Sequence, residues 1–199
     1  MLKGVSTLAR DKWNRIWAGS ENGFRGAYYI DAEGHPWVYE GFKLQSSDKT
    51  SQNIKRIVQG VGSKLWFMPV ETAANPSDTY TVFWFSGNVH LGGAIREEIP
   101  LGEHTVTQAF DLAETQTGDL ILATDKGLFS KSGKVWTEED GLKSARISHV
   151  LEAPDSSIWL CYFLGLGVAR IAPDGRVQHF DESDGLPSNR VWSLSLIHI

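Results

Sequence analysis

Residues Arg146 to Ser193 read RISHVLEAPDSSIWLCYFLGLGVARIAPDGRVQHFDESDGLPSNRVWS, and this stretch decides the fold. It holds four short apolar runs, at 147–151, 158–163, 168–171 and 177–180. Turn-forming residues separate these runs, which is the pattern of β-strands joined by tight turns. The connector DGLPSN at 184–189 then breaks the chain, and Arg190-Val191-Trp192 begins the same pattern again.

The same unit recurs upstream. Its copies align on the pairs Ile16-Trp17, Leu65-Trp66, Leu120-Ile121 and Ile158-Trp159, at spacings of 49, 55 and 38 residues. Apolar residues stand at two fixed distances before each pair, at Val5, Ile54, Ala109 and Ile147 and again at Leu8, Ile57, Leu112 and Val150. This common register shows that the insertions between copies lie in loops.

Each upstream copy also reads as four strands. We expect these at 5–9, 15–19, 27–31 and 36–39, then 54–58, 64–68, 79–85 and 89–91, then 107–113, 120–124, 127–130 and 134–137. A glycine beside Asn, Asp, Ser or Glu precedes the last strand of every copy, at 33–34, 87–88, 132–133 and 174–175. Glycine adopts positive φ at little cost, so these pairs predict type I′ or related hairpin turns.

Repeated four-stranded antiparallel units of about 45 residues predict an all-β chain with the β-propeller fold. The blades are expected at 5–53, 54–106, 107–146 and 147–190, with the start of a fifth at 191–193. The anchor tryptophans should pack between adjacent blades, because one blade cannot bury its own faces. The last six residues, LSLIHI at 194–199, interrupt the pattern. We interpret them as a non-native tail and the chain as a fragment of a longer gene product.

The composition excludes several classes of partner. The chain has 199 residues, 41% hydrophobic content and a formal net charge of −5, with no run of Lys or Arg. Nucleic-acid binding depends on clustered basic residues, so no such partner is expected. No apolar stretch approaches the roughly 18 residues of a membrane span, and the N-terminus lacks a signal-peptide core. The single cysteine, Cys161, lies in an apolar run and is expected to be buried and inert.

The second-strand boxes and the connector resemble the two-component regulator propeller repeat. That pattern runs from an apolar strand through a D-x-x-G-x-[IL]-W box and a G-[LV] pair to a GLP-x-N-x-V connector. The matching segments are 11–19, 64–66, 119–128, 155–168 and 184–191, and the match is strongest over 109–193. Ile121 stands where tryptophan is usual, and 70–78 and 92–103 depart from the pattern as insertions.

The resemblance implies the ligand-sensing input domain of a bacterial signalling receptor, with two seven-bladed propellers outside the cytoplasmic membrane. An immunoglobulin-like module, one membrane helix and a histidine kinase or diguanylate cyclase would follow outside this segment. It further implies a periplasmic location, a small-molecule or oligosaccharide ligand, a homodimer, and no enzymatic activity or membrane contact in this segment itself. This signalling role rests on analogy with the family.

Strand alternation favours one end of the blades as a binding face. Loops between second and third strands emerge on the same side as the blade connectors, and this side receives 20–26, 40–52, 70–78, 92–104, 125–126 and 163–165. Long loops on a rigid scaffold commonly carry binding residues. The predicted ligand-binding residues, which offer stacking and charge to a sugar or other small solute, are Phe24, Arg25, Phe42, Glu71 and Phe163. The alternative is that these loops only seal the joints between blades.

The sequence predicts no catalytic residue, metal or cofactor. His35, His90, His104, His149 and His179 are scattered and share no spacing with a nucleophile, and there is no HExxH, P-loop or paired-cysteine motif. The acidic runs at 138–140 and 181–184 lack the spacing of a calcium cage and are interpreted as solvated turns.

Two other functions remain open. A propeller glycoside hydrolase or lyase would need two facing carboxylates, and the loop carboxylates to test are Glu71, Glu97 and Glu98. A propeller that binds carbohydrate without catalysing a reaction is grouped with this alternative. A propeller that binds another protein is the third.

Overall fold

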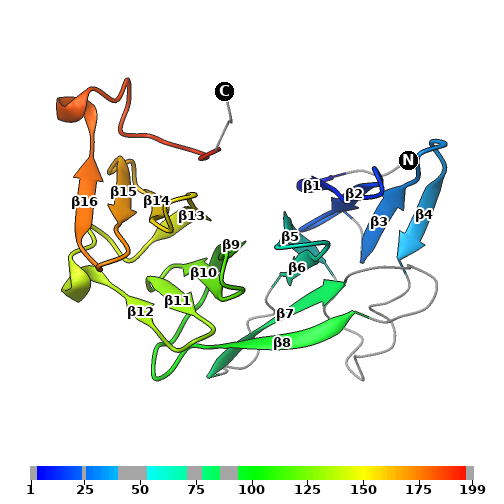
Figure 1. Ribbon diagram of the computed structural model, residues 1–199, viewed down its shortest axis with the longest axis horizontal. Helices are drawn as coiled ribbons and strands as arrows, with labels where there is room; N and C mark the ends of the chain where they lie inside the picture. The colour runs from blue at the N-terminus through cyan, green and yellow to red at the C-terminus, as the bar shows by residue number, and fades with distance from the viewer. Residues whose placement is uncertain (1–3, 24–25, 40–52, 71–77, 86–93, 196–199) are drawn as a thin grey trace. The chain divides into compact units, whose positions relative to one another are not determined.

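The computed structural model describes residues 4–23, 26–39, 53–70, 78–85 and 94–195. These residues form four four-stranded sheets, each with its strands in chain order (Figure 1). The first two sheets hold β1 Thr7–Arg10, β2 Ile16–Gly19, β3 Ala27–Ile30 and β4 Pro36–Tyr39, and β5 Ile54–Gln59, β6 Leu65–Pro69, β7 Thr79–Phe85 and β8 Ile95–Pro100. The other two hold β9 Ala109–Glu114, β10 Leu120–Thr124, β11 Leu128–Ser130 and β12 Val135–Trp136, and β13 Ile147–Glu152, β14 Ile158–Tyr162, β15 Val168–Ile171 and β16 Val177–Phe180.

The four sheets confirm the predicted four-stranded blades, and the strand pairs with a described register are antiparallel. One strand was misplaced. The fourth strand of the second blade, expected at 89–91, is β8 at Ile95–Pro100, within a segment predicted to be a loop. Its sequence IREEIP has a charged middle, and Ile95 is half exposed while Ile99 is fully buried. An outermost strand with polar residues facing solvent resembles a loop when only sequence is available.

One turn geometry recurs within the blades. At Asp31 the backbone amide donates to the carbonyl of His35, and the amide of Gly34 donates back to the carbonyl of Asp31. The same pair of bonds starts at Asp11, Thr115, Ser130, Ala153 and Ala172. Only the fourth residue of each turn has positive φ, as at Gly34 (89°), whereas a type I′ turn needs two such residues. The predicted glycine turns at 33–34, 132–133 and 174–175 are confirmed, but they are the longer kind in which a single left-handed residue forms a bulge. The turn predicted at 87–88 lies outside the described residues.

The chain divides into two compact units, one of residues 1–75 and 81–98 and the other of 76–80 and 99–199. The core of the first unit is aromatic. Trp17 on β2 is fully buried, and its ring lies 5.1–5.4 Å from the rings of Tyr29, Tyr39, Phe67 and Phe85, which belong to both blades. An anchor tryptophan therefore packs between adjacent blades, as predicted.

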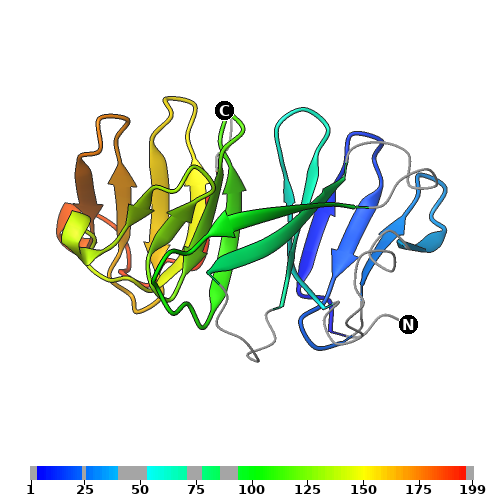
Figure 2. The ribbon, with the colours of Figure 1, turned by 90° about the horizontal axis from the view of Figure 1, so that it is seen from below.

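The core of the second unit is mainly aliphatic. It joins β10 and β11 of the third blade to β13 and β14 of the fourth (Figure 2). Its fully buried members include Leu128, Ile147 and Leu160. Ile121 replaces the anchor tryptophan here and is 2% exposed, and it packs in a cluster of mainly aliphatic side chains that also holds Trp136 and Tyr162. No helix in the described part of the chain is both long and apolar enough to cross a bilayer.

A side chain on the first strand of one blade also caps a backbone amide of the next. In the first unit the hydroxyl of Thr7 accepts the N–H of Ile57 at 3.1 Å. In the second unit the carboxylate of Asp111 accepts the N–H of Val150, also at 3.1 Å. Thr7 and Asp111 occupy the same position of the repeat, so the same type of hydrogen bond is formed at both of these blade joints.

Candidate functional site

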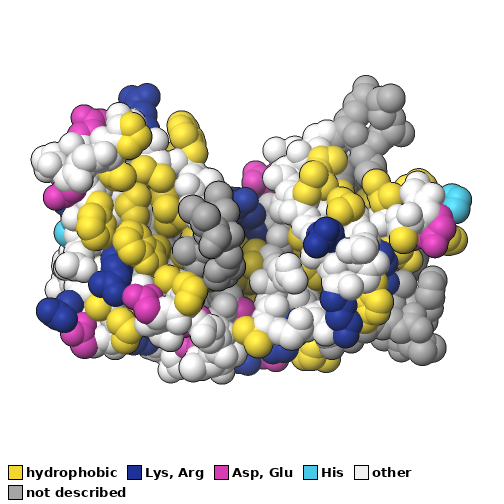
Figure 3. Space-filling view, turned by 45° about the horizontal axis from the view of Figure 1, so that its top comes forward, with side chains coloured by type: hydrophobic (Ala, Val, Ile, Leu, Met, Phe, Trp, Pro, Cys, Tyr) yellow, Lys and Arg dark blue, Asp and Glu magenta, His cyan; other side chains and the backbone are white. Residues whose placement is uncertain are grey.

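A pocket of about 270 Å³ lies in the second unit, at the end of the fourth blade where loops and connectors meet. Ser148 of β13 and Tyr162 of β14 form one wall. The loop 163–165 and the segment 190–192, which starts the fifth copy of the repeat, complete it. The pocket therefore belongs to the face that the strand order favours for binding. Hydrophobic side chains also gather on the surface of this unit (Figure 3).

A short 3-10 turn, η3 (Glu182–Asp184), holds the connector that leads to the pocket. Asp181 caps it by accepting the amide of Ser183, and Gly185 follows with φ of 101°. Hydrogen bonds from the Ser183 side chain and from Lys143 lower the pKa of Asp181 to about 2, so this cap stays ionised at neutral pH. The matching turn η2 (Glu138–Asp140) of the third blade has the same capping box and left-handed glycine. The acidic runs are therefore structural caps on exposed turns.

One hydrogen bond joins the connector to the loop beside the pocket, and two more hold the connector itself in place. The amide of Gly167 donates to the carbonyl of Asn189 at 2.9 Å. Asn189 is itself fixed to Glu182, because each residue donates its amide to the other's side chain, at 3.0 and 2.9 Å. A Cβ on Gly167 would lie 2.1 Å from the carbonyl oxygen of Phe180, so only glycine allows this close approach.

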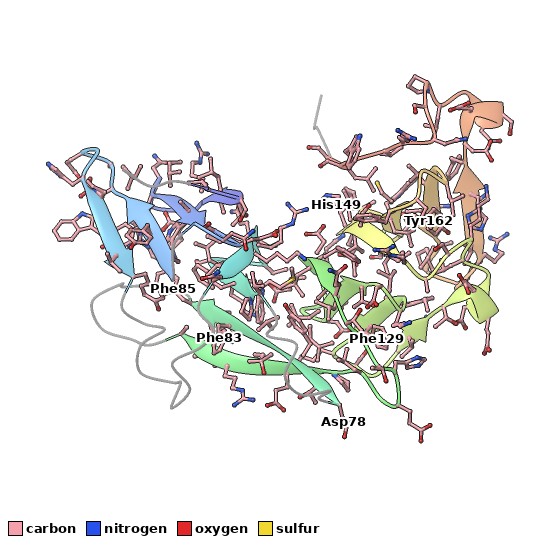
Figure 4. All side chains as sticks on the ribbon, turned by 180° about the vertical axis from the view of Figure 1, so that it is seen from behind. Asp78, Phe83, Phe85, Phe129, His149 and Tyr162 are labelled. Atoms are coloured by element: carbon pink, nitrogen blue, oxygen red, sulfur yellow. The ribbon has the colours of Figure 1, made fainter. Side chains whose placement is uncertain are left out.

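Tyr162, labelled in Figure 4, lines the pocket beside Ser148. Its ring is 1% exposed, and its hydroxyl accepts the amide of Lys143 at 3.0 Å and lies 3.3 Å from Nδ1 of His179. Burial raises the pKa of the phenol to about 12. Nε2 of His179 is 2.9 Å from the carbonyl of Gly141, so this histidine joins the tyrosine to the preceding connector. The pair is a structural element of the fourth blade.

Phe163 is the exposed rim of the pocket. Its amide donates to the carbonyl of Arg146 at 2.9 Å, and its ring packs at 5.2 Å from that of Phe110. The guanidinium carbon of Arg146 lies 4.7 Å from the centre of the same ring. Phe163 is nevertheless 47% exposed. An aromatic ring supported on one side and open on the other is a suitable surface for stacking.

The equivalent loop of the third blade is tied to its connector by side-chain hydrogen bonds. There Asp125 accepts hydrogen bonds from the amides of Thr107 and Gln108 and from the Thr107 hydroxyl, at 2.6–3.1 Å. Burial raises the pKa of Asp125, but these hydrogen bonds, together with the nearby Lys126, outweigh burial and leave the pKa below its ordinary value. The Asp125 loop seals its connector, which is the alternative role considered for these loops.

Of the predicted ligand-binding residues, the structure places Phe163 in the pocket. Phe24, Arg25, Phe42 and Glu71 lie outside the described residues. Sequence reasoning missed Arg190 and Trp192, because both were interpreted only as part of the repeat pattern. Their position directly after the connector, on the same side as the loop 163–165, is the signal that could have identified them.

The remaining polar candidates have structural surroundings. Glu97 and Glu98, predicted in a loop, lie on β8, where Glu98 pairs with Arg96 at 2.6 Å and Glu97 accepts Nε1 of Trp84 at 3.4 Å. Burial and the neighbouring Asp111 raise the pKa of the Cys161 thiol to about 12. Within the described ranges no group of three or more His, Cys, Asp or Glu side chains is placed to hold a metal ion.

His149 is the one histidine paired with a buried acid in the described part of the chain. Its Nδ1 contacts the Asp111 carboxylate, whose side chain is 4% exposed, and its Nε2 is 3.2 Å from the carbonyl of Leu194 (Figure 4). The ring of His104 packs against Phe129 at 5.2 Å, and His35 lies on an exposed hairpin turn beside Asp31. His90 is outside the described residues.

No protein-family model matches the chain, and a search of curated proteins gives no significant match. Solved structures do match. The extracellular domain assigned to the hybrid two component system BT4673 of B. thetaiotaomicron aligns over 88% of this chain with a TM-score of 0.64 and 16% identity. That of BT3049 from the same organism aligns over 94% with a TM-score of 0.62 and 18% identity. A streptogramin B lyase aligns over 88% with a TM-score of 0.59 and 18% identity.

The chain has the β-propeller fold. It spans 24% of the BT4673 domain, 23% of the BT3049 domain and 54% of the streptogramin B lyase. The fold is thus shared with extracellular domains of two component systems and with a lyase. At 16–18% identity this similarity shows the fold, and the site must be judged from its own residues.

Proposed function

We propose that this chain is part of the periplasmic sensor propeller of a bacterial two-component-type receptor. The connector carries the proposal. A capping box, a 3-10 turn and a left-handed glycine follow both β12 and β16. After β16 the sequence GLPSNRV at 185–191 matches the GLP-x-N-x-V connector of the two-component regulator propeller repeat, while after β12 the match is limited to Gly141-Leu142. The similarity to extracellular domains of two hybrid two component systems supports the same assignment.

In this proposal the loop-rich end of the blades binds the signal. The pocket at the fourth blade offers a concave site with an aromatic rim, which suits a small molecule or one residue of an oligosaccharide. Ligand binding would shift the pairing of propellers in a homodimer, and the shift would pass through a membrane anchor outside this segment. A ligand can do this only if it binds one arrangement more tightly than the other.

The gene context tests the assignment. Amplifying the locus from source DNA and reading in both directions across the codon of Ser193 should give further repeats, one membrane helix and a histidine kinase or cyclase. Native codons for LSLIHI followed by a stop would overturn both the sensor assignment and the non-native tail. A secretion signal upstream, with a stop soon after the last blade, would instead favour an enzyme.

A propeller lyase is the second candidate. It is favoured by the streptogramin B and virginiamycin B lyases among the similar structures, one of which is catalytically inactive as a histidine-to-alanine variant. His149 with its partner Asp111 is the pair to examine. However, the His149 side chain is only 15% exposed and both of its nitrogens have neighbours, so it lacks access to a substrate. Loss of quinupristin on incubation with the protein, abolished by His149→Ala, would establish this alternative.

A further inference from the structure

The pocket at the fourth blade has a local charge opposite to that of the whole chain. The chain carries 24 acidic and 19 basic residues, yet the pocket is lined by Arg190 and by no carboxylate. Within the described ranges the Arg190 guanidinium has neither an ion pair nor a side-chain hydrogen bond. An arginine with unused donors in a concave site is a common recognition element for carboxylate or phosphate.

A second arginine stands beside the pocket rim. Arg146 stacks on Phe163, and its Nε is buried without a hydrogen-bond partner in the described part of the protein. A buried donor with no acceptor costs free energy, so such a group usually marks a place where an acceptor is bound. Arg190 in the pocket lining and Arg146 on the Phe163 ring therefore both bring positive charge next to the loop 163–165.

The other walls of the pocket are apolar or already used. Phe163, Leu164 and Trp192 are 47%, 60% and 83% exposed, which leaves flat hydrocarbon surface open to a ligand. The Tyr162 hydroxyl is engaged with Lys143 and His179, and the Ser148 hydroxyl donates to the carbonyl of Cys161 at 3.2 Å. Specificity must then come from the charge of the arginines and from stacking on the aromatic rings.

We infer that this pocket binds a small carboxylate carried on a ring, with the carboxylate on Arg190 and Arg146 and the ring face on Phe163 and Trp192. The volume of about 270 Å³ lies at the lower limit for small-molecule sites, which favours a single ring. The inference deepens the proposed sensor function by naming the chemical class of its ligand. An acidic sugar and an aromatic acid share this chemistry.

Binding of matched acid and neutral probes tests the inference. Galacturonate and galactose form one pair, and benzoate and benzyl alcohol form the other; the dissociation constants are measured by ligand-observed NMR on the protein extended through its native following repeats. In at least one pair the acid should bind about tenfold more tightly than its neutral partner. The pair that shows this difference tells whether the ring is a sugar or an aromatic.

Variants assign that binding to the pocket. Arg190→Gln and Arg146→Gln should each weaken the acid about tenfold, and Phe163→Leu should weaken acid and neutral probes together. Arg176→Gln is the matched control, because Arg176 is an 82% exposed arginine in a hairpin turn of the same blade and pairs with Asp174. Equal midpoints of urea unfolding for Arg190→Gln and Arg176→Gln would show that Arg190→Gln still folds.

Three results would overturn the inference. They are the absence of acid binding up to about 10 mM, equal affinity for acid and neutral partner, or unchanged acid affinity in Arg190→Gln. None of them bears on the gene context, so a sensor receptor with a different ligand site would still be recognised. Conversely, acid binding that depends on Arg190 in a protein without a membrane anchor would keep the site and reject the receptor.

Discussion

Replacing Asp111 should weaken the joint between the third and fourth blades. Its carboxylate is buried, accepts the amide of Val150 at 3.1 Å and pairs with His149. Asp111→Val keeps a branched side chain but removes both interactions. An unpaired buried amide costs about 1–3 kcal/mol, and the loss of the pair with His149 adds to this. We expect a total loss of about 2–4 kcal/mol in the free energy of unfolding.

Asp111→Thr separates the two effects. Thr7 stands at the same repeat position in the first unit and accepts the amide of Ile57 at the same 3.1 Å, so a threonine hydroxyl can serve the joint. The free energy of unfolding of the Thr variant should exceed that of the Val variant by about 1 kcal/mol or more, although the two side chains have almost the same shape. Urea unfolding followed by tryptophan fluorescence gives the free energies, and amide exchange at Val150 reports the hydrogen bond directly. Equal stability and equal Val150 exchange in the two variants would refute the reasoning.

Three further predictions concern the second unit. Gly167→Ala should destabilise it by at least about 2 kcal/mol, because a Cβ would meet the Phe180 carbonyl at 2.1 Å. Gly175→Ala, with similar φ and open space, should cost only about 1 kcal/mol in the same urea titration. The Cys161 thiol, with its pKa raised to about 12, should react with a disulfide reagent at pH 8 roughly a thousandfold more slowly than an exposed thiol, and rising urea should abolish the protection. The pKa of Asp125 is lowered on folding, so its carboxylate stabilises the fold above its unfolded pKa of about 3.9 and loses that effect as the pH falls through the folded value. The stability difference between wild type and Asp125→Asn should therefore shrink below about pH 4 in urea titrations across pH.

The repeat predicted the blades because its signals are local. Alternating apolar runs and a left-handed residue at the fourth position of each turn, usually glycine, come from residues that are close in sequence, and the structure has strands at nearly all of the expected places. The exception is β8. Its residue Ile99 is fully buried, but the residues before Ile99 are charged, so the strand lacks a clear apolar pattern. Phe85 and Ile95 are well separated in the sequence, and a long connection does not fix the register of the strands that it joins. The pairing of β8 with β7 could therefore not be predicted.

The pocket was only partly predictable for a different reason. Strand alternation gives the side on which a loop emerges, which was enough to select Phe163. It does not tell whether a loop is sealed or open. Asp125 seals its loop with side-chain hydrogen bonds to the connector. The loop at Phe163 is held by the backbone hydrogen bond to Arg146 and by ring contacts, and it leaves the Phe163 ring 47% exposed. That difference depends on contacts between residues far apart in sequence.

The position occupied by Thr7, Asp111 and His149 connects the blade joints to the pocket. These residues share one place in the repeat, and the first two cap an amide of the next blade. His149 has the same position one blade later, but its Nε2 lies 3.2 Å from a carbonyl, that of Leu194, two residues beyond Trp192 in the pocket wall. A change in the Asp111–His149 contact would therefore shift the segment that contains Trp192. Substitution of Asp111 should accordingly alter probe affinity as well as stability, whereas Thr7→Val, at the joint of the first unit, should alter stability alone.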